Sequence, residues 1–541
     1  MSKKISRRSF LTLVGAAATA SALTACGGND SSVASGSANT SSASAASGDY
    51  KDTLLVATYG DQDTLDPQVN VTNDKVLRLM YDGLLRYNEN SEIEGALAET
   101  WETSEDNLTW TFHLRKGVKF ANGKELTSAD VVATFDRLMN PDHPLRYSEK
   151  VSFLDKVEAV DDYTVQMTLA HEYGIVEDVL SGQSCFIMDK DYIDQYGYDI
   201  GVDPQTINGT GPYKITSWDA DEQMTFEANE NWWGGVPGCT KMVYKVIPEA
   251  NSRAMALETG EVDLLDRPSV SDYARLAEMD GMVGISQPGY GLQGFQFNCS
   301  DNSVCKDVLV RQAISYAIDR ETIVTSLYGP IGETATHAPV TPNVFGYYDF
   351  GVAPYDAEKA KELLAQAGHA DGIEISLMTY DGYNKGVELA EAVKQYLDAV
   401  GINTTIESVD GATFNASLNG LTPDDFKWDM FIMGFGAIGG IEADAALRRV
   451  CVTSSDGLNT NNYGWYSNSR VDELLTGAVV EMDKEKRKEM YHEAEQIIYL
   501  DDPFAVYMNL RSSLYVMTDK VENFAINAAQ VVEFEKIKVR A

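Results

Sequence analysis

The stretch that decides the fold reads Ala-Leu-Ala-Glu-Thr-Trp-Glu at residues 96–102 and Asp-Asn-Leu-Thr-Trp-Thr-Phe-His-Leu-Arg-Lys-Gly-Val-Lys-Phe at residues 106–120. Within it, residues 108–114 alternate between apolar and polar side chains, which predicts a half-buried strand. Asn122-Gly123 follows and predicts a hairpin turn. Residues 127–139 begin with a threonine and repeat apolar side chains on one face, so we expect a capped helix after the hairpin.

On both sides of this stretch, strands and helices alternate. A short apolar run in residues 51–58 predicts a first strand, which ends in the loop Tyr59-Gly60-Asp61. Apolar residues at helical spacing predict helices in residues 73–85, 252–259, 310–328, 357–367, 386–400 and 483–499. No internal repeat is present, and the mixture predicts an α/β protein.

The N-terminus has the pattern of an export signal. Arg7 and Arg8 precede an apolar core, residues 10–22, that is too short to span a bilayer as a mature anchor. Leu23-Thr24-Ala25-Cys26-Gly27 resembles a bacterial lipobox, so we expect residues 1–25 to be removed and Cys26 to carry lipid. Residues 6–11 also resemble a twin-arginine motif, and the choice between that export route and the general secretory route stays open.

Residues 26–50 contain the cysteine and a segment of small and polar residues, with Val33 as the one sizeable apolar side chain before Tyr50. Such a composition cannot bury a core, so we expect a flexible tether. The remaining chain of about 490 residues is long enough for two or three domains. The sequence therefore predicts a protein held by lipid on the outer face of a bacterial membrane, or in the periplasm.

The chain is strongly acidic, with 82 acidic and 43 basic residues. An acidic surface repels phosphate backbones, which argues against a nucleic-acid partner. The charge favours cationic cargo, or else it serves solubility alone, and the composition does not decide between the two.

Five cysteines remain after the lipidated one: Cys185, Cys239, Cys299, Cys305 and Cys451. An odd number excludes complete intramolecular pairing and argues against a disulfide-dense scaffold, although Cys299 and Cys305 could close a small loop. No C-x-x-C motif is present and no histidine lies near the cysteines, so we expect neither a metal site nor a cofactor.

Four more motifs follow the opening stretch along the chain. They are Gly-Thr-Gly-Pro-Tyr at residues 209–213, Asn-Glu-Asn-Trp-Trp-Gly-Gly at 229–235, Gly-Glu-Val-Asp at 260–263 and Val-Arg-Gln-Ala-Ile-Ser-Tyr-Ala-Ile-Asp-Arg at 310–320. Each alone has an ordinary structural explanation, such as a core position for the tryptophan pair. In this order, the five resemble the extracytoplasmic solute-binding proteins of ABC importers, in the family of oligopeptide-, dipeptide- and nickel-binding proteins.

The resemblance covers residues 51–541 and implies a bilobed periplasmic-binding-protein fold of class II with an extra third domain. It implies a first lobe built from residues 51–85, 210–295 and 505–541, an inserted domain at 86–209, and a second lobe at 296–504. We expect a monomer that encloses a small-molecule or peptide ligand at the hinge and delivers it to a membrane permease, since closure shifts the population toward the form that the permease recognises.

The resemblance also implies where the ligand binds. The expected residues come from the loop after the first strand, the strand before a Gly-Trp motif, the hinge, and a loop that holds a tyrosine. In this sequence they correspond to Tyr59, Gly60, Asp61, Phe295, Tyr383, Gly434, Phe435, Gly436, Ala437, Ile438 and Tyr507.

This chain departs from the peptide-binding pattern at both charged anchors. Phe435 replaces the tryptophan, and Ile438 stands where relatives have the acid that pairs with the ligand ammonium; Glu442 and Asp444 lie nearby as substitutes. Asp381 stands where the dipeptide branch has an arginine for the ligand carboxylate. Because terminal ion pairs carry much of short-peptide affinity, we expect poor dipeptide binding, and better binding of longer peptides or of a neutral oligosaccharide.

The alternative of another class is a surface-anchored hydrolase. His171-Glu172 begins an H-E-x-x-H pattern, but position 175 is isoleucine, and no G-x-S-x-G elbow is present. No histidine lies between His369 and His492, which argues against nickel and haem as cargo. We therefore expect a binding protein and not an enzyme.

Overall fold

The computed structural model of the protein describes residues 49–71, 74–329, 333–380, 385–418, 420–436, 441–455, 457–458, 462–527 and 529–541. Within these residues, eleven strands form one sheet, in which β13 (Glu333–Ala335) pairs with β17 alongside the main order. That order is β15 (Ile402–Val409), β14 (Ile373–Tyr380), β16 (Met430–Gly436), β12 (Met282–Phe297), β17 (Ala505–Thr518), β11 (Leu264–Asp266), β1 (Thr53–Thr58), β10 (Lys241–Val246), β9 (Gln223–Ala228) and β8 (Tyr213–Asp219).

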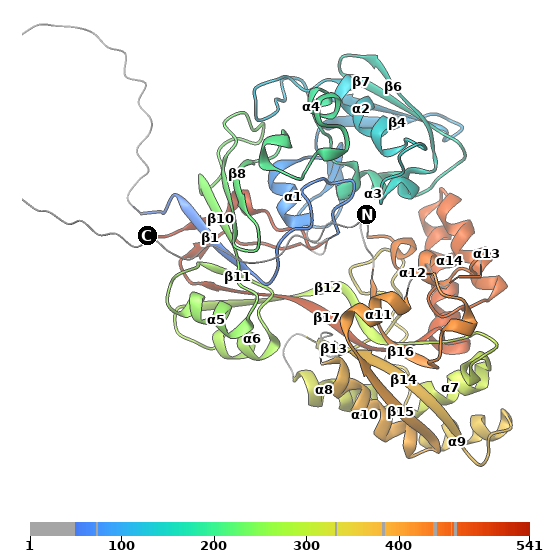
Figure 1. The fold of residues 1–541 in the computed structure, drawn as a ribbon. Helices are drawn as coiled ribbons and strands as arrows, with labels where there is room; N and C mark the ends of the chain where they lie inside the picture. The colour runs from blue at the N-terminus through green and yellow to red at the C-terminus, as the bar shows by residue number, and fades with distance from the viewer. Residues whose placement is uncertain are drawn as a thin grey trace, which may run out of the picture. The chain divides into compact units, whose positions relative to one another are not determined.

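One part of the sheet is built around β1. β1 is parallel to both β10 and β11, so the carboxyl ends of β1 and β11 lie at the same edge. Helices α5 (Ala250–Glu258) and α6 (Val270–Leu276) lie beside β11 (Figure 1) and pack on it through a buried apolar cluster. This packing places the loop that follows β1 next to the residues that follow β11.

Another part of the sheet is built around β14. β14 is parallel to β15 and to β16, and its helices pack in one buried cluster with these strands. The helices of that cluster are α7 (Val308–Ala317), α8 (Arg320–Tyr328), α9 (Ala357–Gln366), α10 (Gly386–Asp398) and α11 (Gly411–Ser417). A second apolar cluster contains α12 (Ala443–Cys451), α13 (Ser469–Val480) and α14 (Lys484–Gln496).

Residues 98–169 contain a separate four-stranded sheet with its own core. The strand order is β4 (Ala98–Thr103), β5 (Thr109–Leu114), β7 (Thr164–Leu169) and β6 (Leu154–Asp161). Helix α2 (Ser128–Leu138) packs on it, with Thr127 as N-cap and a capping box to Asp130, which confirms the predicted strand and capped helix. The shorter elements are α3 (Val176–Leu180), α4 (Lys190–Tyr196), and a hairpin of β2 (Leu85–Tyr87) with β3 (Ile93–Gly95).

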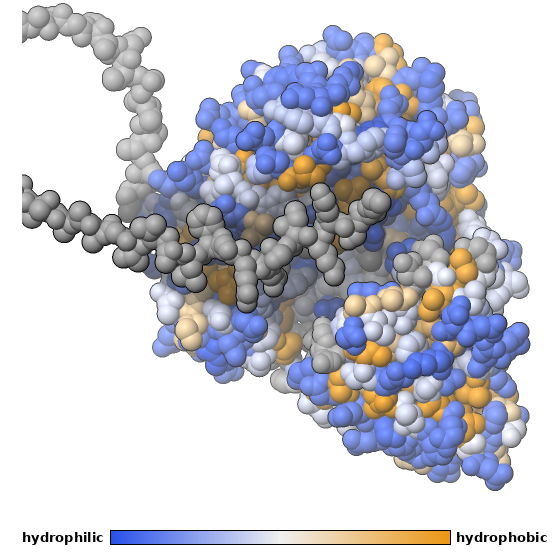
Figure 2. Space-filling view, in the orientation of Figure 1, coloured by the Kyte–Doolittle hydropathy of each residue, from blue (hydrophilic) through white to orange (hydrophobic). Residues whose placement is uncertain are grey.

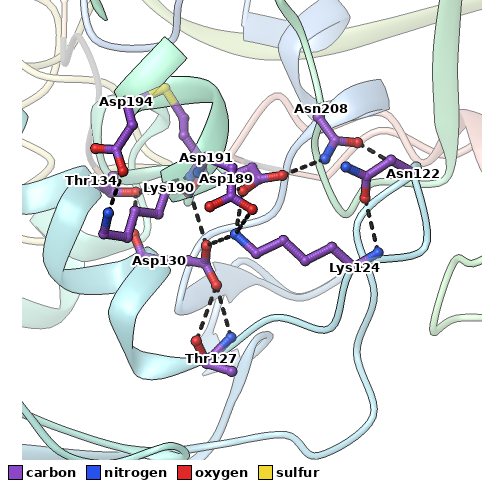
Figure 3. A network of polar contacts seen from close by, with 11 residues as sticks. Asn122, Lys124, Thr127, Asp130, Thr134, Asp189, Lys190, Asp191, Asp194 and Asn208 are labelled. Carbon is purple, nitrogen blue, oxygen red and sulfur yellow. Dashed lines mark hydrogen bonds and ion pairs between the residues drawn. The ribbon is translucent and has the colours of Figure 1, made fainter.

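A polar network joins residues 122–130 to Asn208, which directly precedes the Gly-Thr-Gly-Pro-Tyr motif (Figure 3). Lys124, just after the hairpin turn, forms ion pairs with Asp130 at 2.8 Å and with Asp189. The other oxygen of Asp189 accepts a hydrogen bond from the Asn208 side chain at 2.7 Å. The Asn208 side-chain oxygen in turn accepts from the Asn122 amide at 3.1 Å. The network therefore brings the hairpin next to the Gly-Thr-Gly-Pro-Tyr motif.

Two predicted helices differ from the structure. The single helix expected over 310–328 is two helices, because Ile318 is extended and Asp319 accepts a hydrogen bond from the Thr322 amide and starts α8. The helix expected over 73–85 is shorter, since α1 (Asp74–Met80) ends before β2 begins.

The C-terminal residues end in a short pair, β18 (Val521–Glu522) with β19 (Lys538–Val539). Figure 2 shows a face on which hydrophilic residues predominate and hydrophobic residues are scattered, as the acid-rich composition predicts. Among the residues that the structure describes, no helix is long and apolar enough to cross a membrane.

Candidate ligand site at the crossing strands

Two long antiparallel strands, β12 and β17, belong to both parts of the large sheet (Figure 1). β12 pairs with β16 through residues 291–297, and β17 pairs with β11 through residues 515–517. Their mutual register shifts between Pro288 and Leu292 and again between Gln293 and Gly294. Since such irregularities bend strands locally, this crossing is the structural candidate for the hinge.

The loop Tyr59-Gly60-Asp61 lies at the carboxyl edge of β1. The Asp61 carboxylate accepts hydrogen bonds from the Trp218 indole at 3.0 Å and from the Asp221 amide at 2.8 Å, so it holds the turn between β8 and β9. Tyr59 is 45% exposed, and its hydroxyl accepts a hydrogen bond from the Arg267 guanidinium at 3.1 Å. No heavy atom lies within 4 Å of the place where Gly60 would carry a Cβ. Tyr59 and Gly60 are therefore accessible, whereas Asp61 is engaged.

The predicted residues Gly434, Phe435, Gly436 and Phe295 lie on the paired strands β16 and β12. Gly434, Phe435 and Gly436 pair with residues 291–293 of β12. The Phe435 ring is 6% exposed, and its centroid lies 4.7 Å from that of Tyr507. Phe295 and Tyr507 are themselves 0% and 1% exposed. Phe435 and Tyr507 pack in one apolar cluster and Phe295 in another, and direct contact of the three side chains with ligand stays a prediction.

Several predicted residues lie outside the described ranges. They are Cys26, Tyr383, Ala437 and Ile438, together with the replaced anchor Asp381. Their flanking residues are described: Tyr380 ends β14 and Gly436 ends β16, and these two strands are parallel. Both predicted ligand loops therefore leave the sheet at the same edge, where open α/β sheets bind ligands.

The two substitute acids already have basic partners. Glu442 forms an ion pair with the buried Arg487 at 3.2 Å, and Asp444 pairs with Arg448 at 2.6 Å. Burial raises the pKa of Glu442 to about 7, although Arg487 acts in the opposite direction. Burial also raises the pKa of Asp444. Neither carboxylate is presented to a ligand ammonium group in this structure.

Polar contacts join residues in and next to α3 to Ile441 and Val479. Asp178 on α3 accepts hydrogen bonds from the Tyr87 hydroxyl at 2.6 Å and from the Ile441 amide at 2.8 Å. The Gly174 amide donates to the Val479 carbonyl at 2.7 Å. Burial raises the pKa of Asp178 to about 6, against the lowering effect of these hydrogen bonds. Asp178 therefore joins two segments that are 263 residues apart in the sequence.

Sequence reasoning did not find Arg267, Arg511 or Asp178. Arg267 and Arg511 are exposed and lie beside the crossing, and Asp178 joins α3 to Ile441. Arg267 has a backbone φ of 57°, which is unusual for a residue other than glycine. No local sequence signal marks these three residues, because their positions depend on strand pairing between distant segments.

Two small cavities are lined mainly by residues between 319 and 355. One of about 360 Å³ is lined by residues 319–321 and 352–355 with His337. The other, of about 260 Å³, is lined by residues 334–337, Val340, Pro342, Tyr347 and Leu510. Neither includes a predicted ligand residue. Within the described ranges, no group of three His, Cys, Asp or Glu side chains is arranged to hold a metal, and the five cysteines after Cys26 are free thiols, so Cys299 and Cys305 are not joined.

Comparison with known proteins identifies the class. The family "Bacterial extracellular solute-binding proteins, family 5 Middle" matches residues 92–456, and the chain belongs to this family. Glutathione-binding protein GsiB of Salmonella choleraesuis is 29% identical over 454 residues, which cover 83% of this chain and 88% of that protein. Heme-binding protein A of Haemophilus influenzae is 30% identical over 453 residues, covering 79% of this chain and 80% of that protein.

The fold agrees with solved structures. The periplasmic binding protein DppA from Helicobacter pylori, in complex with peptide STSA, matches with a TM-score of 0.77 and 26% identity over 91% of this chain and 99% of that chain. The predicted family and α/β fold are thereby confirmed. The protein is an extracytoplasmic solute-binding component of an ABC importer, which binds ligand and works with a permease, and it is not an enzyme.

Proposed function

We propose that this protein captures peptides at the crossing of β12 and β17, closes its two lobes around them and delivers them to its permease. The observation that supports this best is the contact of Asp178 with the Ile441 amide, because it joins the inserted domain to the second lobe beside a predicted ligand loop. A contact between lobes stabilises a closed state, and ligand that bridges the lobes shifts the population further toward it.

The proposed lobes follow the sequence-based boundaries. Residues 51–85, 210–295 and 505–541 form the first lobe, residues 86–209 the inserted domain and residues 296–504 the second lobe. In this arrangement β12 ends where the first lobe passes into the second, and β17 begins where the chain returns to the first. The two strands then act as the hinge, and the monomer needs no second copy to complete the site.

The peptide class is supported by relatives and by the site. Two relatives are named as a glutathione-binding and a heme-binding protein, and the structure of DppA from Helicobacter pylori was solved in complex with a peptide. The site presents accessible backbone at Gly60, which suits recognition of a peptide through its main chain. Since Glu442 and Asp444 are engaged by arginines, we expect free dipeptides to bind poorly.

A thermal-shift screen tests the function. Protein freed of ligand by unfolding and refolding is measured with glutathione, dipeptides, a tetrapeptide library and neutral oligosaccharides. A ligand that binds only the folded state raises the melting temperature. We expect the largest rise with peptides of three or more residues. Stabilisation by dipeptides alone would overturn the selectivity, and stabilisation by oligosaccharides alone would overturn the peptide class.

Lipid attachment at Cys26 is proposed from the Leu23 to Gly27 motif and the following tether. The test is Cys26→Ser, followed by cell fractionation and mass determination of the released protein. We expect the variant in the medium or unprocessed, whereas the unchanged chain stays with the membrane. A variant that remains anchored at the mature length would refute the lipid attachment.

A further inference from the structure

Two buried carboxyl groups from distant segments meet at one contact. Asp178 on α3 is 5% exposed, and Glu442, the N-cap residue of α12, is 8% exposed. The Asp178 carboxylate accepts a hydrogen bond from the Ile441 amide at 2.8 Å, and Glu442 directly follows Ile441 in the chain. With the proposed domain boundaries, α3 belongs to the inserted domain and α12 to the second lobe. The two acids therefore lie close together on opposite sides of a domain contact.

The same contact covers the partner of Glu442. The Arg487 guanidinium is 1% exposed and donates a hydrogen bond to Glu442 Oε1 at 3.2 Å. From the inserted domain, the Gly174 amide donates to the Val479 carbonyl at 2.7 Å. A Cβ on Gly174 would lie 2.8 Å from Arg487 Nη1, so the backbone at this glycine lies directly against the guanidinium. Parting of the two domains would expose the pair of Glu442 and Arg487 to water.

The contact disfavours a negative charge on either acid. Glu442 Oε2 is buried and has no hydrogen-bond partner within the described part of the chain, which makes ionisation costly. Burial raises the pKa of Glu442 to about 7 and the pKa of Asp178 to about 6. Repulsion across the contact acts in the same direction, because Asp178 raises the pKa of Glu442 and Asp444 raises that of Asp178.

Other titratable and charged groups face the two acids from both domains. They are Tyr87, Lys150, Tyr173 and Glu177 of the inserted domain, and Asp444, Arg448, Lys484, Arg487 and Tyr491 of the second lobe. Tyr87 and Lys150 lower the pKa of Asp178, and Arg487 lowers that of Glu442, but burial outweighs them. When the domains part, water reaches both acids and their mutual repulsion ends, so both pKa values should fall toward their ordinary range.

We propose that closure of the lobes takes up a proton at Asp178 and Glu442, so that the protein holds its ligand more tightly in acid and releases it more readily as the pH rises. The inference rests on the proposed peptide function, in which this contact belongs to the closed state. Carboxyl groups in water ionise near pH 4, whereas those in the contact ionise near 6 and 7. Between these limits the closed state binds more protons than the open state, and acid therefore favours closure.

Equilibrium dialysis at pH 5 and pH 7 tests the proposal. The probe is a tetrapeptide library built from residues without titratable side chains, whose terminal groups change little in charge over this interval. Mass spectrometry measures the peptides retained by the refolded mature protein, and circular dichroism checks that the protein is folded at both pH values. We expect about tenfold higher retention at pH 5 than at pH 7, at a protein concentration below the dissociation constant.

Matched variants separate proton uptake on closure from other effects of pH. Asp178→Asn and Glu442→Gln keep the size of each side chain but cannot ionise, so each should reduce the pH effect and the double variant should abolish it. Glu535→Gln is the control: burial raises the pKa of this carboxyl group to about 7 as well, but its charged neighbours are Glu533, Arg86 and Asp82. The control should keep the tenfold effect.

The outcomes distinguish this proposal from the peptide function. Equal retention at both pH values, higher retention at pH 7, or an undiminished pH effect in the folded double variant would overturn proton uptake on closure alone. Retention of no peptide at either pH would overturn the peptide function itself.

Discussion

Replacing Asp178 with alanine should weaken lobe closure by an amount that its contacts determine. The Asp178 carboxylate accepts one hydrogen bond from Tyr87 and one from the Ile441 amide. With the proposed domain boundaries, only the hydrogen bond from the Ile441 amide crosses between the lobes. A hydrogen bond to a charged group contributes about 1.5–3 kcal/mol, and the lower end applies here because burial of the carboxylate opposes its ionisation. About 1.5 kcal/mol corresponds to a roughly tenfold loss of ligand affinity.

Tyr87→Phe is the matched control, because it removes the partner of Asp178 on its own side and leaves the bond to Ile441. Isothermal titration calorimetry with the best-binding peptide of the screen measures affinity, and urea unfolding measures stability. We expect Asp178→Ala to lower affinity about tenfold and Tyr87→Phe to lower stability with little change in affinity. Equal affinities for Asp178→Ala and the unchanged protein would refute the role of this contact in closure.

Two further predictions concern stability. Burial raises the pKa of Glu442 from 4.5 to about 7, so the contribution of Glu442 to stability is fully present below pH 4.5 and is lost as the pH rises through 7. In urea unfolding, the stability advantage of Glu442→Gln over the unchanged protein should therefore grow between pH 5 and 8. A difference in stability that stays constant with pH would contradict this assignment. Phe435→Ala should lower the free energy of unfolding by about 3–5 kcal/mol, because its ring packs against Tyr507 and Phe504. Phe435→Leu should cost much less, and a loss of ligand affinity in Phe435→Ala without a loss of stability would show that the ring is a ligand wall instead.

Much of the fold could be predicted from the sequence, because local patterns carry it. Alternation in residues 108–114 gave the strand β5, and the threonine before residues 128–138 gave the capped helix α2. The order of five motifs identified the family. Apolar periodicity wrongly predicted a single helix over residues 310–328, because the apolar spacing continues through Ile318 although Asp319 starts a new helix. A capping side chain there outweighs the helical pattern.

The site could be predicted only in part. Residues in loops that follow strands, such as Tyr59 and Gly60, are found from their position after an apolar run. The partner of Tyr59 could not be found this way, because Arg267 follows another strand 208 residues farther along the chain. The burial of Phe295 and Tyr507 could not be predicted from the sequence either. These residues lie in the core because β12 and β17 pair, and no local sequence pattern indicates that pairing.

Small-angle X-ray scattering of the refolded mature protein, with and without the tetrapeptide library, tests the central claim most directly when the peptides are recovered afterwards for mass spectrometry. Closure of the lobes on a peptide predicts a smaller radius of gyration with the library present, and recovery of every peptide intact. A radius that does not change while peptides are bound, or the appearance of cleaved peptides, would contradict a hinge-closing binding protein.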